Sequence, residues 1–215
     1  MRRSLTIATT IAATSAVALA VPALAAGSGT CDGTGPKAGQ QAGTGNRAGM
    51  GPGRGMGPGA QAGQGLMNLP TGTLTDEQKA DLAFMAEEEK LAMDVYTVLG
   101  KKYPKTVVFK NIAKSEQRHW NAISMLLDRY GLADPTDGNA AGVFTSPELQ
   151  KMYNDLVASA TTRTAALKVG VAIEEEDIAD LQEAATGVTA PDVSQVYSNL
   201  TRASERHLAA FQSRL

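Results

Sequence analysis

Two short stretches of this 215-residue chain place a histidine where it could bind a metal ion. His119 follows Glu116 by three positions in "KSEQRHW", and the only other histidine, His207, lies in the similar stretch "ASERHLAAF". Residues three or four apart on an α-helix share one face. Glu116 and His119 would therefore direct an oxygen and a nitrogen ligand at one point. Carboxylate with imidazole suits iron, manganese or zinc, and several carboxylates favour iron or manganese.

Acidic residues also interrupt the apolar faces of other expected helices. Glu89 has apolar neighbours at helical spacing on both sides, whereas Glu87 is expected to face solvent. Glu174 lies on an apolar face, with Asp177 one turn further on, and His207 lies on another. Burying a carboxylate without a partner or a metal is costly. We counted the residues between each of these inward groups and the link that joins its helix to a neighbouring one. At the rise of an α-helix, the groups lie at similar heights along the bundle, to within about one turn. We therefore predict that they meet in the middle of one core.

Four long helices must position these residues. Thr75 and Gln78 form a capping-box pattern that begins the first helix, and no segment after residue 71 alternates with the period of a strand. Short links predict two antiparallel pairs, and one long stretch joins the pairs. The sequence thus predicts an all-α four-helix bundle with one long crossover. The helices are expected at about 75–100, 107–130, 162–186 and 191–214, with a short helix from Ser146 inside the crossover 131–161.

The first 70 residues have a different composition. Residues 1–25 combine a basic start, an apolar run and Ala-Leu-Ala before the expected cleavage point, which predicts a signal peptide and an exported protein with no membrane span after cleavage. Fifteen of the 22 glycines lie in the first 65 residues, so 26–70 is expected to be a disordered linker. The globular domain is expected at 71–215. Cys31 is the only cysteine, which excludes an internal disulfide.

The charge balance excludes some partners. The formal net charge is −2, which gives no electrostatic signature of a nucleic-acid-binding protein or of binding to an anionic membrane. The expected partners are metal ions, an external electron donor and, in a homodimer, a second copy of the chain.

Several phrases resemble known ferritin-like proteins. "EKLAMDVY" fits the Glu-x-x-Ala-x-x-x-Tyr pattern of rubrerythrins, and "FKNIAKSEQRH" resembles their second ligand helix. Residues 75–215 as a whole resemble a bacterial ferritin-like domain family of unknown function, through "EEEKLAMDVY", "FKNIAKSEQRH", "ALKVGVAIEEEDIADL" and "ASERHLAAF". The resemblance implies a ferritin-like four-helix bundle whose metal ligands are Glu89, Glu116, His119, Glu174 and His207.

The chain departs from the ferritin-like pattern on its last helix. A di-iron site of that type has glutamate three residues before the second histidine, and here the position is Ser204. Glu205 is expected to point elsewhere, while Asp177 is a candidate for the missing oxygen ligand. The centre could then be an asymmetric pair of metals or a single ion. Tyr96 is expected beside it, either as a hydrogen-bond or redox partner or as a core residue.

The preferred interpretation is an exported protein with a non-haem di-iron or iron–manganese centre, and zinc also fits the ligands. By resemblance, its chemistry would be oxidation of ferrous iron or reduction of peroxide or dioxygen. Because rubredoxin-like cysteine pairs are absent from the sequence, electrons would come from an external donor. Two alternatives remain open: a metal-binding or scavenging protein without turnover, and a metal-free helical interaction domain with a buried Glu–His network.

Overall fold

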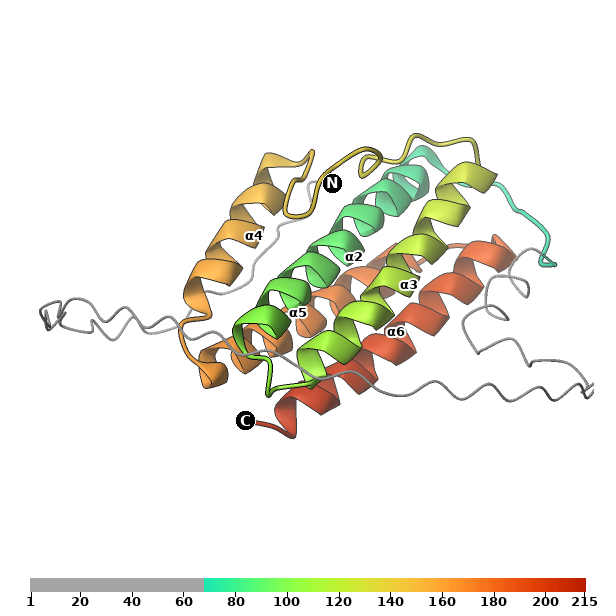
Figure 1. Ribbon diagram of the computed structural model, residues 1–215. Coiled ribbons are helices and arrows are strands. Elements are labelled where there is room, and N and C mark those ends of the chain that lie inside the picture. The colour runs from blue at the N-terminus through green and yellow to red at the C-terminus, as the bar shows by residue number, and fades with distance from the viewer. Residues whose placement is uncertain (1–67) are drawn as a thin grey trace, which may run out of the picture. The chain divides into compact units, whose positions relative to one another are not determined.

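The computed structural model describes residues 68–215, which form five helices and no strand (Figure 1). The predicted all-α class is confirmed for this part of the chain. The expected signal peptide and nearly all of the expected linker lie outside the described residues. Within residues 68–215, no helix is long and apolar enough to cross a membrane. The helices are α2 (Asp76–Lys102), α3 (Val108–Arg129), α4 (Pro147–Ser159), α5 (Arg163–Ala184) and α6 (Pro191–Gln212).

Four of these helices pack as two pairs in a bundle. Helix α2 packs along α3 and α5 packs along α6, each across a short link (Figure 1). The pairs meet through contacts of α2 with α5 and of α3 with α6. Helix α4 belongs to the long crossover and packs against α2 and α5. The two pairs thus face each other across a shared core.

Local sequence explains where several helices begin and end. The Thr75 hydroxyl accepts a hydrogen bond from the backbone N–H of Gln78 at 3.2 Å, and the Gln78 side chain accepts one from the backbone of Thr75 at 3.0 Å. This is the predicted capping box. Ser146 caps α4 in the predicted manner. Gly131 and Gly187 follow α3 and α5 with φ of 63° and 71°, a conformation that glycine adopts without strain.

Helix α2 ends at Lys102, two residues beyond the expected end at about 100. Gly100 instead lies where α2 comes close to α3, and a Cβ there would be 3.5 Å from the backbone nitrogen of Lys110. Tyr103 is the C-cap residue that follows α2, and its N–H donates to the Leu99 carbonyl at 2.8 Å. Pro104 comes next and cannot continue the hydrogen-bond ladder.

The core divides into two apolar clusters along the bundle. One cluster includes the second half of α2 and the first halves of α3 and α5, together with residues of α4 and Phe211 of α6. The other includes the first halves of α2 and α6 and the second halves of α3 and α5. Between them each helix of the bundle contributes polar residues, and these form the candidate site. The polar layer is buried, with Glu89, Glu116, His119, Glu174, Asp177 and Ser204 all at most 8% exposed.

Candidate metal centre

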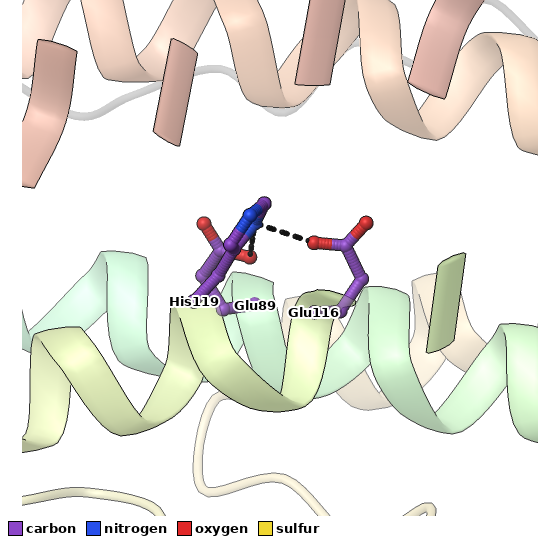
Figure 2. A group of neighbouring side chains, drawn as sticks. All are labelled: Glu89, Glu116 and His119. Atoms are coloured by element: carbon purple, nitrogen blue, oxygen red, sulfur yellow. Dashed lines mark ion pairs between the residues drawn. The ribbon is translucent and has the colours of Figure 1, made fainter. Parts of the chain in front are cut away.

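A first group of ligands comes from the α2–α3 pair. Glu89 lies on α2, and Glu116 and His119 lie one turn apart on α3. Figure 2 shows their side chains extending from α2 and α3 toward the helices on the other side of the bundle. The Nδ1 atom of His119 is 2.6 Å from Oε2 of Glu116 and 3.4 Å from Oε2 of Glu89. Sequence spacing predicted this convergence.

A second group shares one residue with the first. His207 of α6 places Nδ1 2.8 Å from Oε1 of Glu116 and 3.6 Å from Oε2 of Glu174, which lies on α5. In each group the ligand atoms lie within 4.8 Å of one another. The rings of His119 and His207 stack with centroids 5.5 Å apart. Glu116 therefore uses one carboxylate oxygen toward each histidine, and all four helices of the bundle contribute.

Several of these atoms are buried without a hydrogen bond. Within the described chain, the Nδ1 atoms of His119 and His207 and one oxygen each of Glu89 and Glu116 have no hydrogen-bond partner. A buried polar atom left unsatisfied costs roughly 1–3 kcal/mol. Three carboxylates and two imidazoles whose free atoms converge on shared points fit a divalent cation of the iron, manganese or zinc type.

The electrostatics of the cluster are those of a crowded acidic site. Burial opposes the charge on Glu116, but the neighbouring His119 and His207 outweigh it and lower its pKa to about 2. Burial raises the pKa of Glu89 to about 7, and burial together with the Glu116 charge raises that of Glu174 to about 7. Burial acts against protonation of His207, yet Glu116 and Glu174 raise its pKa to about 9. The pKa of His119 is likewise raised, by Glu89 and Glu116. The metal-free cluster therefore holds protons that a cation would displace.

Tyr96 forms part of the wall of the site. It is fully buried, and its hydroxyl donates to Oε1 of Glu174 at 2.7 Å. Burial and the Glu174 charge raise the pKa of Tyr96 well above its usual range, so it remains a donor. The rings of Phe211 and Phe109 pack against Tyr96, with centroids 5.1 and 6.5 Å away. Tyr96 thus holds Oε1 of Glu174 by a hydrogen bond, while Oε2 of Glu174 faces His207.

The position that departs from the ferritin-like pattern is closed to solvent. Ser204 is fully buried, and its hydroxyl donates to the Leu200 carbonyl at 3.2 Å. Asp177 lies against Ser204, and burial with the charges of Glu89 and Glu174 raises the pKa of Asp177 well above its usual range. Asp177 belongs to neither group of converging ligand atoms. Glu205 is exposed, as its place on the helix predicts.

The family of this chain follows from comparison with known proteins. Residues 78–215 match an uncharacterized protein domain, DUF2202. This chain belongs to the DUF2202 family. The uncharacterized protein MJ0754 of Methanocaldococcus jannaschii is 42% identical over 147 residues, which cover 68% of this chain and 79% of MJ0754. A crystal structure of hypothetical protein MJ0754 from Methanococcus jannaschii matches with a TM-score of 0.65 at 42% identity, over 67% of this chain and 82% of that one. The whole candidate site lies inside the DUF2202 domain.

Glu87 has a role that the sequence did not predict. It is 6% exposed, so the prediction that it faces solvent is wrong. Its Oε1 accepts hydrogen bonds from the backbone N–H groups of Thr145, at 2.6 Å, and Ser146, at 3.1 Å. Both donors lie at the start of α4. In the DUF2202 domain the crossover therefore covers the face of α2 that a simple bundle would leave open to water.

A buried ion pair attaches the same crossover to α2. Lys90 and Asp94 lie 2.7 Å apart and are nearly inaccessible. Lys90 also donates to the Ala140 carbonyl at 2.9 Å, and Asp94 accepts from the backbone N–H of Gly142 at 2.9 Å. The i, i+4 spacing of a lysine and an aspartate was visible in the sequence, but such pairs are usually solvated. Only the path of the crossover shows that this one is buried.

Further carboxylates lie where α2 meets α5. Burial and the charges of Asp180 and Asp177 raise the pKa of Glu88 well above its usual range. Glu88, Glu176 and Asp177 also line a narrow cleft of about 20 Å³ beside α4, which is about the space of one water molecule. Burial therefore favours the protonated, neutral forms of Glu88 and Asp177 next to the candidate ligands of the DUF2202 domain.

Proposed function

We propose that this DUF2202 domain is a ferritin-like bundle with a two-metal, non-haem centre of iron, or of iron and manganese. In an exported protein, this centre would oxidise ferrous iron or reduce peroxide or dioxygen. The observation that carries the proposal is that two converging ligand groups share Glu116.

The ligand arrangement supports two ions rather than one. Glu89 and His119 would bind the first ion, Glu174 and His207 the second, and Glu116 would bridge them. Ferritin-like di-metal proteins take single glutamates from two helices and Glu-x-x-His motifs from the other two. Here α3 has the full motif, whereas α6 has Ser204 in place of the glutamate. Glu116 would therefore be the only carboxylate shared by both ligand groups, and the ligand set for the two ions would be asymmetric.

The chain's own residues fit this use. Bound iron would supply the one-electron steps that reactions of dioxygen and peroxide require. Glu116 is ionised at neutral pH and so offers both oxygens as ligands. Tyr96 orients Glu174 through its 2.7 Å hydrogen bond. The two apolar clusters above and below the polar layer exclude water. With Cys31 as the only cysteine, an electron donor would come from outside the chain.

Metal analysis tests the proposal. After anaerobic loading of the full chain with ferrous, manganous or zinc ions, two ions per chain are expected in the wild type and about one in His119→Ala. Glu116→Gln should lose both ions, because it removes the shared ligand. Glu205→Gln, which alters an exposed glutamate of α6, is the matched control and should load like the wild type. Wild-type protein that stays metal-free would refute the two-metal centre.

Two further measurements separate the alternatives. Ser204→Glu should raise metal affinity if it completes a ligand set, and should only destabilise the fold if the cluster is a structural Glu–His network, because it then buries an unpaired charge. Loaded protein should consume peroxide, or oxidise added ferrous iron, faster than free iron does. Loaded protein that does neither would be a scavenger without turnover.

A further inference from the structure

The end of α2 and the start of α3 form the most basic part of the domain. Residues 95–115 contain five lysines and no aspartate or glutamate, in a chain whose formal net charge is −2. In the described structure none of the five forms an ion pair; the lysines that do are Lys79, Lys90 and Lys151. Positive charge is therefore concentrated here without local compensation, and it would attract anions.

A groove between α2 and α3 lies among these lysines. We call it the α2/α3 groove, and its volume is about 440 Å³. Sites for small organic molecules usually measure about 300–1,000 Å³ and combine apolar walls with a few polar groups. The groove has both features. Its apolar lining includes Met93, Gly100 and Ala113, and its charged lining is Lys101, Lys110 and Lys114, all three of which are exposed.

We propose that the α2/α3 groove binds a small organic anion, with an apolar body against Met93, Gly100 and Ala113 and a carboxylate, sulfonate or phosphate group against the lysines. The apolar lining argues against a bare inorganic anion, which would gain nothing from it. The concave shape and modest volume argue against an acidic protein, because stable protein interfaces bury about 800 Å² on each partner. An anion with an apolar part uses both features of the groove.

The groove is adjacent to the candidate metal centre. Tyr96 contributes to its lining, and the hydroxyl of the same residue donates to Glu174. A ligand in the groove would therefore lie on one side of Tyr96 and Glu174 on the other. Binding in the groove does not depend on metal, so this proposal and the two-metal centre can fail separately.

Two fluorescent probes that differ by one charged group test the proposal on the full-length, metal-free protein. 1-Anilinonaphthalene-8-sulfonate has the apolar rings and an anionic group, and N-phenyl-1-naphthylamine has the same rings without the charge. The anionic probe should bind one per chain and at least tenfold more tightly than the neutral one. Equal affinities, or no saturable binding of the anionic probe, would overturn the proposal.

Variants locate the binding site. The double substitution Lys110→Gln/Lys114→Gln should weaken binding of the anionic probe at least fivefold and change the neutral probe less than twofold. The control pair Lys79→Gln/Lys168→Gln removes equal charge outside the groove and should leave both affinities within twofold. If both double variants lost the same affinity for the anionic probe, the probe would be attracted by the overall charge of the protein, and the proposed site would be refuted.

A third set of variants fills the groove. A Cβ at Gly100 makes only ordinary contacts of 3.5 Å or more, so Gly100→Leu should fold and abolish binding of both probes. Thr97→Trp, at an exposed position on the same wall, provides the same test if Gly100→Leu does not fold. Retained binding in a folded, filled variant would overturn the proposal. So would lysine-dependent binding to phosphatidylglycerol vesicles without binding of the anionic probe, which would instead indicate a membrane-facing surface.

Discussion

Glu116 connects the two halves of the candidate centre. Its two oxygens lie 2.6 and 2.8 Å from the Nδ1 atoms of different histidines. Opposing influences act on its charge: burial disfavours ionisation, and the two histidines favour it more strongly. Glu89 and Glu174 each have one histidine neighbour and keep raised pKa values. Position relative to the imidazoles, rather than residue type, thus decides which carboxyl group is ionised.

These shifts predict an unusual pH dependence for the metal-free protein. His207 has a folded pKa of about 9 against an ordinary 6.5, so its stabilising effect is present below pH 6.5 and is lost as pH rises through 9. Glu89 and Glu174 keep protons to about pH 7 that the unfolded chain loses near 4.5, so stability also falls across that window. The melting temperature in a chelator should therefore decrease from pH 5 to pH 9. The His207 shift alone corresponds to at most about 3 kcal/mol.

Metal should reverse this trend, because ligands bind a cation only after losing their protons. Melting temperatures measured with excess manganous ion should rise over the same pH range. His207→Gln should reduce the slope of the metal-free profile between pH 7 and 9, and it should move the loss of the Glu174 proton to higher pH, because His207 lowers the pKa of Glu174. A metal-free melting temperature that rises from pH 5 to 9 would contradict the assigned protonation states.

The candidate ligands could be predicted because their convergence depends on helix geometry alone. The 3.6-residue period puts Glu116 and His119 on one face. The rise per residue puts Glu89, Glu174 and His207 at similar heights, to within about one turn. Residues whose environment depends on the crossover could not be predicted in this way. Glu87, for example, is buried only because the backbone before α4 covers it.

At the scale of the elements, two glycines inside helices have opposite roles. Gly170 of α5 faces the ring of Phe211, and a Cβ there would lie 2.8 Å from three of its ring atoms. Gly100 of α2 has room for a Cβ. The sequence could not distinguish them, since both are glycines within apolar helical patterns. Gly170 is required because α5 packs closely on Phe211 of α6. Gly100 is replaceable because α2 and α3 leave room for a Cβ there.

A matched pair of alanine substitutions tests this difference. Gly170→Ala should destabilise the domain by about 1–3 kcal/mol, because the aromatic ring must move in a packed core. Gly100→Ala should stabilise it by about 0.5–1 kcal/mol, through the lower conformational entropy of alanine in the unfolded chain. Urea unfolding of the three proteins gives both values. Equal effects of the two substitutions would show that the close approach to Phe211 does not limit the fold.

Sequence also predicted most of the helix boundaries, because they depend on local chemistry. The capping box at Thr75, the cap at Ser146 and the glycines at 131 and 187 act within a few residues of chain. The end of α2 lies two residues beyond the expected position, because Gly100 lies at the contact with α3 rather than at the helix end. The signal peptide and linker remain predictions, since the described residues begin at 68.

At the scale of the whole domain, the polar layer divides the hydrophobic core in two. The apolar clusters on either side contain residues from all four helices of the bundle, and the buried Glu–His cluster lies between them. Replacing a buried ionic group with apolar residues of similar volume often stabilises a fold by about 1–4 kcal/mol. A buried polar layer therefore weakens a bundle unless something compensates for its charges. In the proposed function a metal pair provides that compensation.

Replacing the layer with apolar residues tests whether it exists for metal. The variant has methionine at the five ligand positions, which are Glu89, Glu116, His119, Glu174 and His207. It also has Tyr96→Phe, because the Tyr96 hydroxyl would lose its acceptor. These changes connect the two apolar clusters. Methionine adapts to irregular space, so the packing should tolerate it. If the layer serves metal binding, the metal-free variant should melt several degrees above the metal-free wild type and gain nothing from added iron, manganese or zinc. If the Glu–His cluster is a structural network, added metal should raise the melting temperature of neither protein. The variant can melt higher than the metal-free wild type in that case as well. Calorimetry of both proteins, with chelator and with metal, distinguishes the two results.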